Sequence, residues 1–302
     1  MRFRDSFHPW AMTTILFWSL GFVLTRLALR DYTGPSLGFL RYFFASLAMP
    51  LLMRATRVRL PKRADLKWFF LAGAVGFFFY MIAFNKGCET VTAATGSVVI
   101  AVVPVLTALL ARVAFGEKLR PHQWAAIAVE FIGVLVLTMM NGAFSVNAGL
   151  FWLLLAALAL SAYNLLQKKL TRVYSGLEVS AYGIFAGTAL LAVFLPRSVS
   201  QMRAAPPVDL VYIAVLGIFS SAVAYTAWAQ AFKKADRASA VSNYMFVTPF
   251  LTSLMGYVFL GERLDTPTAV GGAVILAGVL LFNFGGSVRI NRKRPEATPP
   301  GL

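Results

Sequence analysis

The sequence predicts an all-α membrane protein with ten transmembrane helices, built as two inverted five-helix repeats. Of its 302 residues, 59% are hydrophobic and 13% are charged, and the mean hydropathy is +0.71. Soluble domains are usually about 45–50% apolar and about 25% charged. In addition, the segment from Ala93 to Leu119 recurs 145 residues later, from Ala238 to Leu264, with 11 of 27 positions identical. A duplicated apolar segment of this length is typical of a two-fold transporter.

The helices are expected where apolar runs are long enough to cross a bilayer. At about 1.5 Å per residue, a hydrocarbon core roughly 30 Å thick needs about 20 residues. Ten such runs follow one another, at 10–29, 35–53, 66–86, 92–115, 121–140, 149–169, 177–196, 209–232, 238–260 and 267–285. The first run follows Arg4, but it is too long for a signal peptide and lacks a small-residue cleavage site. The connections are short and leave no room for a soluble domain.

The basic residues predict the orientation. With the N-terminus in the cytoplasm, 21 Lys and Arg residues fall on the inner side and six at or near the outer side. Both termini are therefore expected in the cytoplasm of a multi-pass inner-membrane protein. Five crossings per repeat then turn the second repeat upside down. We expect repeats over residues 1–145 and 146–288, followed by a disordered basic tail over 289–302.

The duplicated segments each contain a proline near mid-membrane. Pro104 and Pro249 cannot donate a backbone hydrogen bond, which leaves the carbonyls of Ile100 and Met245 without a helical partner. We expect both prolines to act as conformational hinges beside a substrate path. Ser97 and Ser242, seven residues before the prolines, are expected to contact substrate there. The alternative is a proline kink kept for packing alone.

Aromatic side chains fall in the middle of several predicted spans. Pairs four residues apart share a helix face. Together they predict an apolar, aromatic-lined central cavity, although each residue alone is compatible with helix packing. The residues are Trp18, Phe22, Tyr80, Phe84, Tyr163, Tyr225 and Trp228.

Polar and charged side chains within spans allow two interpretations. Asn164 and Asn243 fit hydrogen bonding to a zwitterion, or hydrogen bonding between helices. Arg41 fits a carboxylate ligand or a side chain that snorkels toward the interface, and Glu130 fits a proton carrier or a protonated packing residue.

Other site classes have weak support or none. A further group of residues has simpler expected roles: Lys86 and Glu89 form an ion pair at a turn, while Gly133 and its equivalent Gly278 mark close helix contacts. Cys88 is the only cysteine, and His8 and His122 are isolated, so no metal site or cofactor is predicted. No catalytic constellation or phosphate loop is found, and the basic residues are too dispersed for nucleic-acid binding.

The two proline-bearing segments end in Gly116-Glu117-Lys118-Leu119 and Gly261-Glu262-Arg263-Leu264. With Leu165-Leu166-Gln167-Lys168-Lys169, these motifs resemble the drug/metabolite transporter superfamily, specifically its ten-helix EamA-type members. The chain is most similar to bacterial aromatic amino-acid exporters. The resemblance implies a basket-like bundle with helices 1, 3, 4, 6, 8 and 9 around the pathway.

We therefore expect a secondary transporter that exports amino acids, aromatic and other apolar ones, across the bacterial inner membrane by alternating access. Its partners are the small-molecule substrate and membrane lipid, and the choice between monomer and homodimer stays open. The alternative within transport is an efflux carrier for drugs or other small metabolites. An enzyme would need a constellation that the sequence lacks, and a channel would conduct without alternating protection of the cavity.

Overall fold

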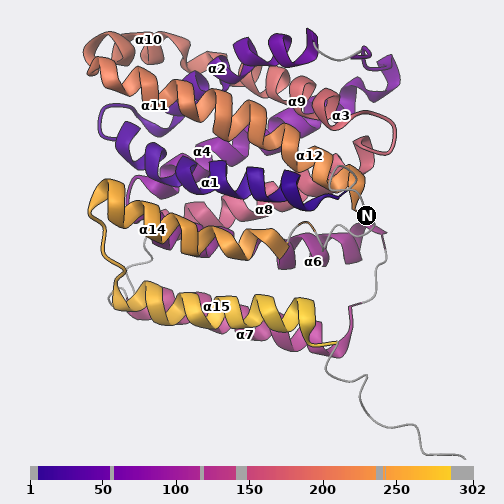
Figure 1. The fold of residues 1–302 in the computed structure, drawn as a ribbon, viewed down its shortest axis with the longest axis vertical. Coiled ribbons are helices and arrows are strands. Elements are labelled where there is room, and N and C mark those ends of the chain that lie inside the picture. The colour runs from indigo at the N-terminus through magenta and orange to yellow at the C-terminus, as the bar shows by residue number, and fades with distance from the viewer. Residues whose placement is uncertain are drawn as a thin grey trace, which may run out of the picture.

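The computed structural model describes residues 6–54, 58–115, 119–140, 148–235, 241 and 243–286, and the regular structure of these residues is entirely helical. The helices lie side by side and run roughly across the longest dimension of the bundle (Figure 1). Each of the ten predicted runs is occupied by a helix or by consecutive helical segments. Seven helical stretches of the described residues are long and apolar enough to cross a membrane. The predicted all-α membrane fold is confirmed.

The helical segments follow the predicted order. The first half contains α1 (His8–Ala28), α2 (Gly34–Arg54), η2 (Arg63–Asp65), α3 (Leu66–Gly73), η3 (Ala74–Phe79), α4 (Tyr80–Cys88), α5 (Ala93–Ile100), α6 (Val103–Phe115) and α7 (Pro121–Met140). The second half contains α8 (Ala148–Leu170), α9 (Gly176–Leu191), η4 (Ala192–Phe194), α10 (Leu195–Ala204), α11 (Pro207–Gly217), η5 (Ile218–Val223), α12 (Ala224–Lys234), η6 (Asn243–Val247), α14 (Thr248–Leu260) and α15 (Thr266–Phe284). Helix α10 lies in the connection between the predicted runs 177–196 and 209–232, where no helix was predicted, and Pro196 lies in its first turn.

Both proline-bearing runs are interrupted, as the sequence predicts. α5 ends at Ile100, two turn residues follow, and α6 begins at Val103. In the second copy, the 3-10 segment η6 leads into α14, whose first turn contains Pro249. Proline fits the first turn of a helix because its missing N–H has no intrahelical acceptor there. The prolines therefore start a new half-helix, whereas the sequence suggested a kink within a continuous one.

A second pair of irregularities was not predicted. η3 and η5 are π-helical turns in the third crossing of each repeat. Such turns leave backbone groups of a helix without their usual partners. Just after η5, Thr14 donates its hydroxyl to the oxygen of Ala224 at 3.0 Å, and Ser180 donates to the oxygen of Tyr225 at 3.0 Å. Hydroxyls from neighbouring helices thus supply hydrogen bonds that lipid cannot.

The two proline-bearing helices run in opposite directions, as an inverted repeat requires. Glu262 follows the end of α14, and its Oε2 accepts a hydrogen bond of 3.0 Å from the N–H of Ala93 at the start of α5. The start of one copy therefore lies beside the end of the other. At the opposite end of α1, the His8 ring contacts the hydroxyl of Tyr244 in η6. These two ends of the bundle are called the Glu262 end and the His8 end below.

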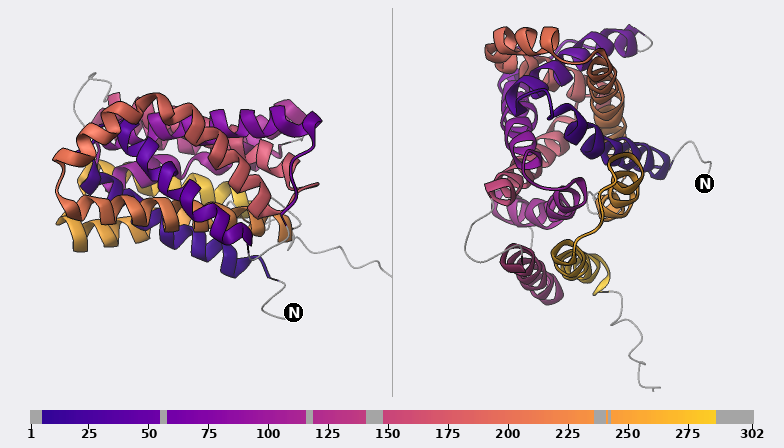
Figure 2. Two further views of the ribbon diagram at one scale, coloured as in Figure 1. Left: turned by 90° about the horizontal axis from the view of Figure 1, so that it is seen from above. Right: turned by 90° about the vertical axis from the view of Figure 1, so that its left-hand side faces the viewer.

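Helices α7 and α15 form a pair at the edge of the bundle (Figures 1 and 2). A Cβ atom on Gly278 would lie 2.4 Å from Cγ of Glu130, and one on Gly133 would lie 2.6 Å from Cγ1 of Ile275. Both distances are too short for a methyl group. The predicted close packing at these two glycines is confirmed.

Candidate functional site: a central aromatic cavity

A small cavity lies at mid-length of the bundle, beside Trp18 at the middle of α1. It is called the central cavity below, and its volume is about 20 Å³. This is space for about one water molecule, whereas small-molecule pockets usually measure about 300–1,000 Å³. The described residues that line it are Trp18, Gly21, Phe22, Arg41, Tyr80, Phe84, Ile100, Leu160, Met245 and Thr248.

Four of the predicted aromatic residues form the wall of this cavity. Trp18 and Phe22 come from α1, and Tyr80 and Phe84 come from α4. The Phe22 and Phe84 rings meet edge to face with centroids 5.0 Å apart, and Tyr80 stacks on Phe84 at 5.5 Å. The four-residue spacing puts each pair on one helix face, and the packing of α1 against α4 then brings the two pairs together.

The other three predicted aromatic residues lie behind this wall. Tyr163, Tyr225 and Trp228 are buried, with exposed fractions of 0–1%. The Trp18 ring packs against Trp228 at 5.1 Å and against Tyr225 at 5.2 Å between centroids. Tyr163 contacts Tyr225 at 6.1 Å. Sequence spacing alone could not separate these supporting residues from those that line the cavity, because all seven lie near mid-span.

The helix breaks also reach the central cavity. Ile100 and Met245, each four residues before one of the two prolines, both line it, and neither carbonyl can accept a hydrogen bond from that proline. Within the described part of the chain, the Trp18 Nε1 and Thr248 Oγ1 atoms are buried without a hydrogen-bond partner. A buried polar atom without a partner costs free energy, so a ligand that supplies one is favoured.

Ser97 and Asn164, two of the four predicted serine and asparagine contacts, do not line the central cavity. Ser97 is fully buried and donates its hydroxyl to a backbone oxygen of its own helix at 2.7 Å. Asn164 donates to the hydroxyl of Thr107 at 3.4 Å and so joins α8 to α6. This geometry agrees with the interhelical alternative for Asn164. Ser242 and the side chain of Asn243 lie outside the described residues.

The sequence allowed two positions for the Arg41 side chain, inside the bundle or directed toward the membrane surface, and the structure shows it inside. It is 5% exposed and lines the central cavity, so it does not snorkel to the membrane surface. Its Nε donates to Oγ of Ser221 at 2.7 Å, and its Nη2 donates to the backbone oxygen of Ser220 at 3.2 Å. Both acceptors belong to the π-helical turn η5. The resemblance placed helix 8 on the pathway and omitted helix 2. Among the described lining residues, however, Arg41 of helix 2 contributes to the wall and helix 8 does not.

Glu130 is remote from this site. It lies on α7, is 3% exposed, and packs against Gly278 of α15. Neither carboxyl oxygen has a hydrogen-bond partner among the described residues. Neither α7 nor α15 contributes a described residue to the central cavity. Glu130 therefore does not line the central cavity, and its two interpretations, a proton carrier or a protonated packing residue, stay predictions.

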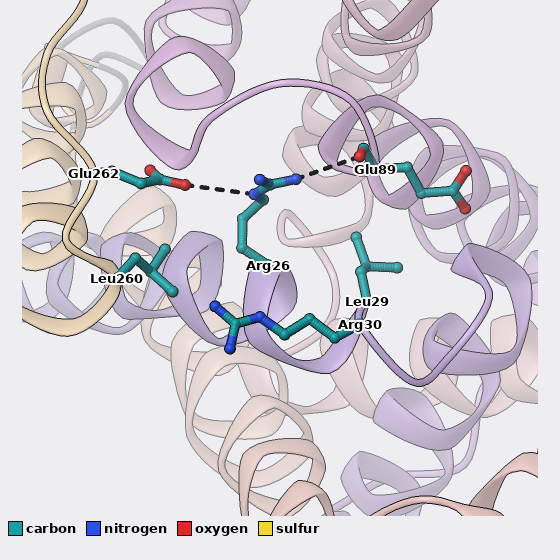
Figure 3. Close-up of a pocket in the computed structure, with 6 residues that line it drawn as sticks. All are labelled: Arg26, Leu29, Arg30, Glu89, Leu260 and Glu262. Carbon is teal, nitrogen blue, oxygen red and sulfur yellow. Dashed lines mark hydrogen bonds and ion pairs between the residues drawn. The ribbon is translucent and has the colours of Figure 1, made fainter.

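Beyond the cavity, the Glu262 end is closed by a cluster around Arg26 (Figure 3). Arg26 Nε lies 3.5 Å from Oε1 of Glu262, and its Nη1 donates to the backbone oxygens of Cys88 at 2.8 Å and Glu89 at 3.3 Å. These contacts join α1 to the α4–α5 turn and to the end of α14. A pocket of about 360 Å³ lies against this cluster. It is lined by Arg26, Leu29, Arg30, Glu89, Leu260 and Glu262.

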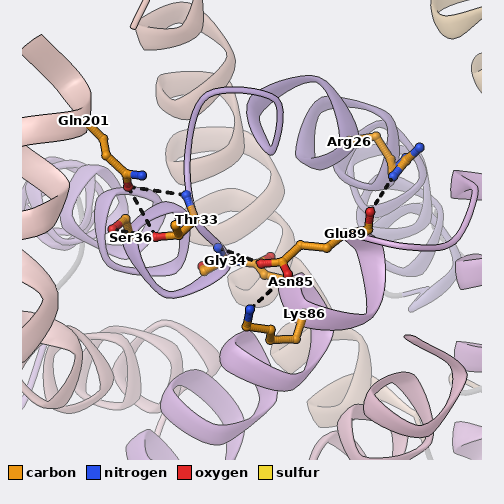
Figure 4. Close-up of polar contacts among 8 residues, drawn as sticks. All are labelled: Arg26, Thr33, Gly34, Ser36, Asn85, Lys86, Glu89 and Gln201. Atoms are coloured by element: carbon orange, nitrogen blue, oxygen red, sulfur yellow. Dashed lines mark hydrogen bonds and ion pairs between the residues drawn. The ribbon is translucent and has the colours of Figure 1, made fainter. Parts of the chain in front are cut away.

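Further polar contacts hold the turns at this end (Figure 4). Glu89 pairs with Lys86 at 2.9 Å, as the sequence predicts, and also accepts a hydrogen bond of 3.1 Å from the Gly34 N–H. Gly261 adopts φ = +65°, which lets the chain reverse after α14 and direct Glu262 toward α5. The equivalent motif residues 116–118 lie outside the described residues.

At the His8 end, the start of α1 meets η6. The His8 ring contacts the hydroxyl of Tyr244, and a pocket of about 400 Å³ lies beside this contact. Its lining residues are Ser6, His8, Pro9, Met12 and Tyr244. The described residues contain no group of three or more His, Cys, Asp or Glu side chains that could hold a metal ion. A pocket therefore lies at each end of the bundle, beside a contact between the two halves of the chain.

Comparison with known proteins agrees with this arrangement. The family model described as the EamA-like transporter family matches two segments, residues 6–139 and 147–284. A "Probable terminal-alkyne amino-acid exporter" of Streptantibioticus cattleyicolor is 32% identical over 293 residues, which cover 97% of each chain. A "Probable amino-acid metabolite efflux pump" of Escherichia coli is 24% identical over 286 residues, covering 91% of this chain and 94% of that protein.

One solved structure, titled only "Crystal structure of protein", shares the fold. Its TM-score is 0.65 at 20% identity, and the match covers 95% of this chain and 99% of that one. The family and the named relatives are transporters and not enzymes.

Proposed function

Because this chain belongs to the EamA-like transporter family, we propose that it exports amino acids, aromatic and other apolar ones, through the central cavity by alternating access. The aromatic wall of that cavity is the observation that carries the proposal. Trp18, Phe22, Tyr80 and Phe84 provide ring faces and edges that suit a bulky apolar side chain. The names of the two relatives support an amino acid as the substrate.

Polar groups of an amino acid have partners at the same place. Trp18 Nε1 and the Thr248 hydroxyl have no partner among the described residues. The indole N–H can donate a hydrogen bond to a substrate, and the hydroxyl can donate or accept one. The backbone at the two helix breaks offers carbonyl oxygens near Ile100 and Met245, which suit an ammonium group. Supporting rings behind Trp18 keep its indole in place.

A change of conformation is required for transport. The central cavity of about 20 Å³ is much smaller than an amino acid needs, so it must widen toward one end to admit substrate. The Arg26–Glu262 pair and the His8–Tyr244 contact each join the first half of the chain to the second. If the Arg26–Glu262 pair separates while the His8–Tyr244 contact is kept, the Glu262 end opens; the opposite combination opens the His8 end. Two inverted halves can exchange conformations and so alternate between these two states.

The distribution of charge supports an orientation in the membrane, and the names of the relatives support export. In the proposed orientation the protein lies in the bacterial inner membrane, and the positive-inside bias supports a cytoplasmic His8 end, an outer Glu262 end and both termini inside. Substrate would enter from the His8 end and leave past Arg26. A cationic side chain in the cavity, Arg41, makes the alternative of cationic drug efflux less favourable.

The proposal is tested by reconstitution of the purified protein in liposomes loaded with unlabelled phenylalanine. We expect uptake of radiolabelled phenylalanine by counterflow, with leucine and tryptophan as competitors and protein-free liposomes as the control. Imposed proton gradients would separate antiport from facilitated diffusion. Absence of counterflow for every amino acid, or currents through an open pore, would contradict the proposal.

A further inference from the structure

Arg41 is the charged side chain in the wall of the central cavity, and no described carboxylate neutralises it. The ion pairs of the described residues join Arg26 to Glu262 and Lys86 to Glu89. Arg41 is 5% exposed, and its neighbours in the wall are mainly aromatic and apolar. Removal of a guanidinium from water without a counter-charge is costly, and such residues within membrane spans commonly mark a substrate or ion path.

The guanidinium is held in a fixed position with donors to spare. Its Nε bonds to Ser221 Oγ at 2.7 Å, and its Nη2 bonds to the Ser220 oxygen at 3.2 Å. An arginine has five N–H donors, so the hydrogen bonds within the described residues leave three of them unused. The π-helical turn η5 provides both acceptors and anchors one edge of the guanidinium. A planar fork with free N–H groups is suited to the two oxygens of a carboxylate.

We propose that Arg41 binds the α-carboxylate of the transported amino acid, an inference that rests on the proposed function. The aromatic wall holds the apolar side chain, and Arg41 sets the orientation of the polar end. The carboxylate supplies the negative charge that the cavity lacks, so binding neutralises a buried cation. This assignment predicts a substrate class: compounds with a free carboxylate beside an apolar group. The corresponding amines and amides, which lack the carboxylate, are excluded.

A ligand series on the wild-type protein tests this directly. In phenylalanine counterflow, unlabelled phenylalanine is compared as a competitor with phenylalanine amide, phenethylamine and 3-phenylpropionate. We expect the amide and the amine to compete at least about tenfold more weakly than phenylalanine, because each lacks the charge-assisted hydrogen bonds of the carboxylate. We expect 3-phenylpropionate to compete better than phenethylamine. Equal competition by phenylalanine and its amide would overturn the inference.

Substitution of Arg41 adds a second readout. Arg41→Gln should weaken phenylalanine competition at least about tenfold and leave competition by phenylalanine amide unchanged, so the preference for the acid over the amide falls by that factor. Arg41→Lys should retain part of the preference for the acid over the amide. Lysine keeps the positive charge but lacks the planar pair of N–H donors that binds both carboxylate oxygens. Arg54→Gln, at an exposed arginine of the same helix, is the matched control and should keep the wild-type preference.

The outcomes separate the two proposals. If the wild-type protein carries no amino acid, the proposed function fails and this inference fails with it. If it carries phenylalanine but Arg41→Gln keeps the preference for the acid, only the role of Arg41 is refuted, and its bonds to η5 are then structural. If Arg41→Gln does not fold, the wild-type competition series alone decides.

Discussion

Replacement of Glu262 by glutamine should loosen the Glu262 end of the bundle. The carboxylate lies 3.5 Å from Arg26 and accepts a hydrogen bond of 3.0 Å from the Ala93 N–H. The Glu262 side chain is 16% exposed and the Arg26 side chain 29%. Loss of a partly exposed ion pair costs about 0.5–1 kcal/mol. Exchange of a charged acceptor for a neutral amide costs a similar amount. The sum of about 1–2 kcal/mol favours the open arrangement about 5- to 30-fold.

The protein contains its own reporter for this opening. Cys88 is the only cysteine of the chain, is 1% exposed, and its backbone oxygen accepts a bond of 2.8 Å from Arg26. We expect Glu262→Gln to raise the rate at which a membrane-impermeant maleimide labels Cys88 by about 5- to 30-fold. The reagent is added from outside to intact cells or right-side-out vesicles, and the labelled fraction is followed by mass spectrometry.

Lys86→Gln is the matched control. Lys86 pairs with Glu89 at 2.9 Å within one turn and makes no described contact with α14. Its loss should leave Cys88 labelling at the wild-type rate. The reasoning is refuted if Glu262→Gln is also labelled at that rate, or if Lys86→Gln accelerates labelling equally.

Two further substitutions test the cavity and the peripheral pair. Tyr80→Ala removes a ring from the cavity wall and should raise the half-saturation concentration for phenylalanine about tenfold, whereas Trp228→Ala, behind the wall, should mainly lower the thermal midpoint of the purified protein. Equal effects of both variants on half-saturation would contradict this division. Gly278→Ala places a methyl group 2.4 Å from Cγ of Glu130 and should cost about 1–3 kcal/mol of stability while phenylalanine half-saturation stays unchanged. If the thermal midpoint of Gly278→Ala equals that of the wild type, α7 and α15 can move apart to admit the methyl group at little cost, and the reasoning is contradicted.

Several features of the fold could be predicted from the local pattern of the sequence. The helical crossings follow from runs of about 20 apolar residues, because lipid forces the backbone to satisfy its hydrogen bonds within each span. The helix breaks follow from Pro104 and Pro249, which lack a donor wherever they are placed. The contact at Gly133 and Gly278 follows from the absence of a side chain at equivalent positions of the repeat.

Other features of the fold could not be predicted from the local sequence. The π-helical turns η3 and η5 contain no proline, and hydroxyls from other helices bond to the backbone just after η5. Ser97 matched its repeat equivalent in type and spacing, yet its hydroxyl bonds to its own helix and not to the cavity. Helix α10 was missed because it is too polar to appear as an apolar run long enough to cross a membrane.

For this chain, composition and internal duplication were sufficient for the membrane class, the helical fold and the inverted repeat. These features depend on hydrophobicity and crossing number, which neighbouring residues cannot alter. Only the tertiary structure separated Trp18 and Tyr80, on the cavity wall, from Trp228 behind it, and placed Arg41 on the wall. The physical reason is that a side chain's environment at mid-membrane depends on which helix packs against it, and that packing joins residues far apart in the chain.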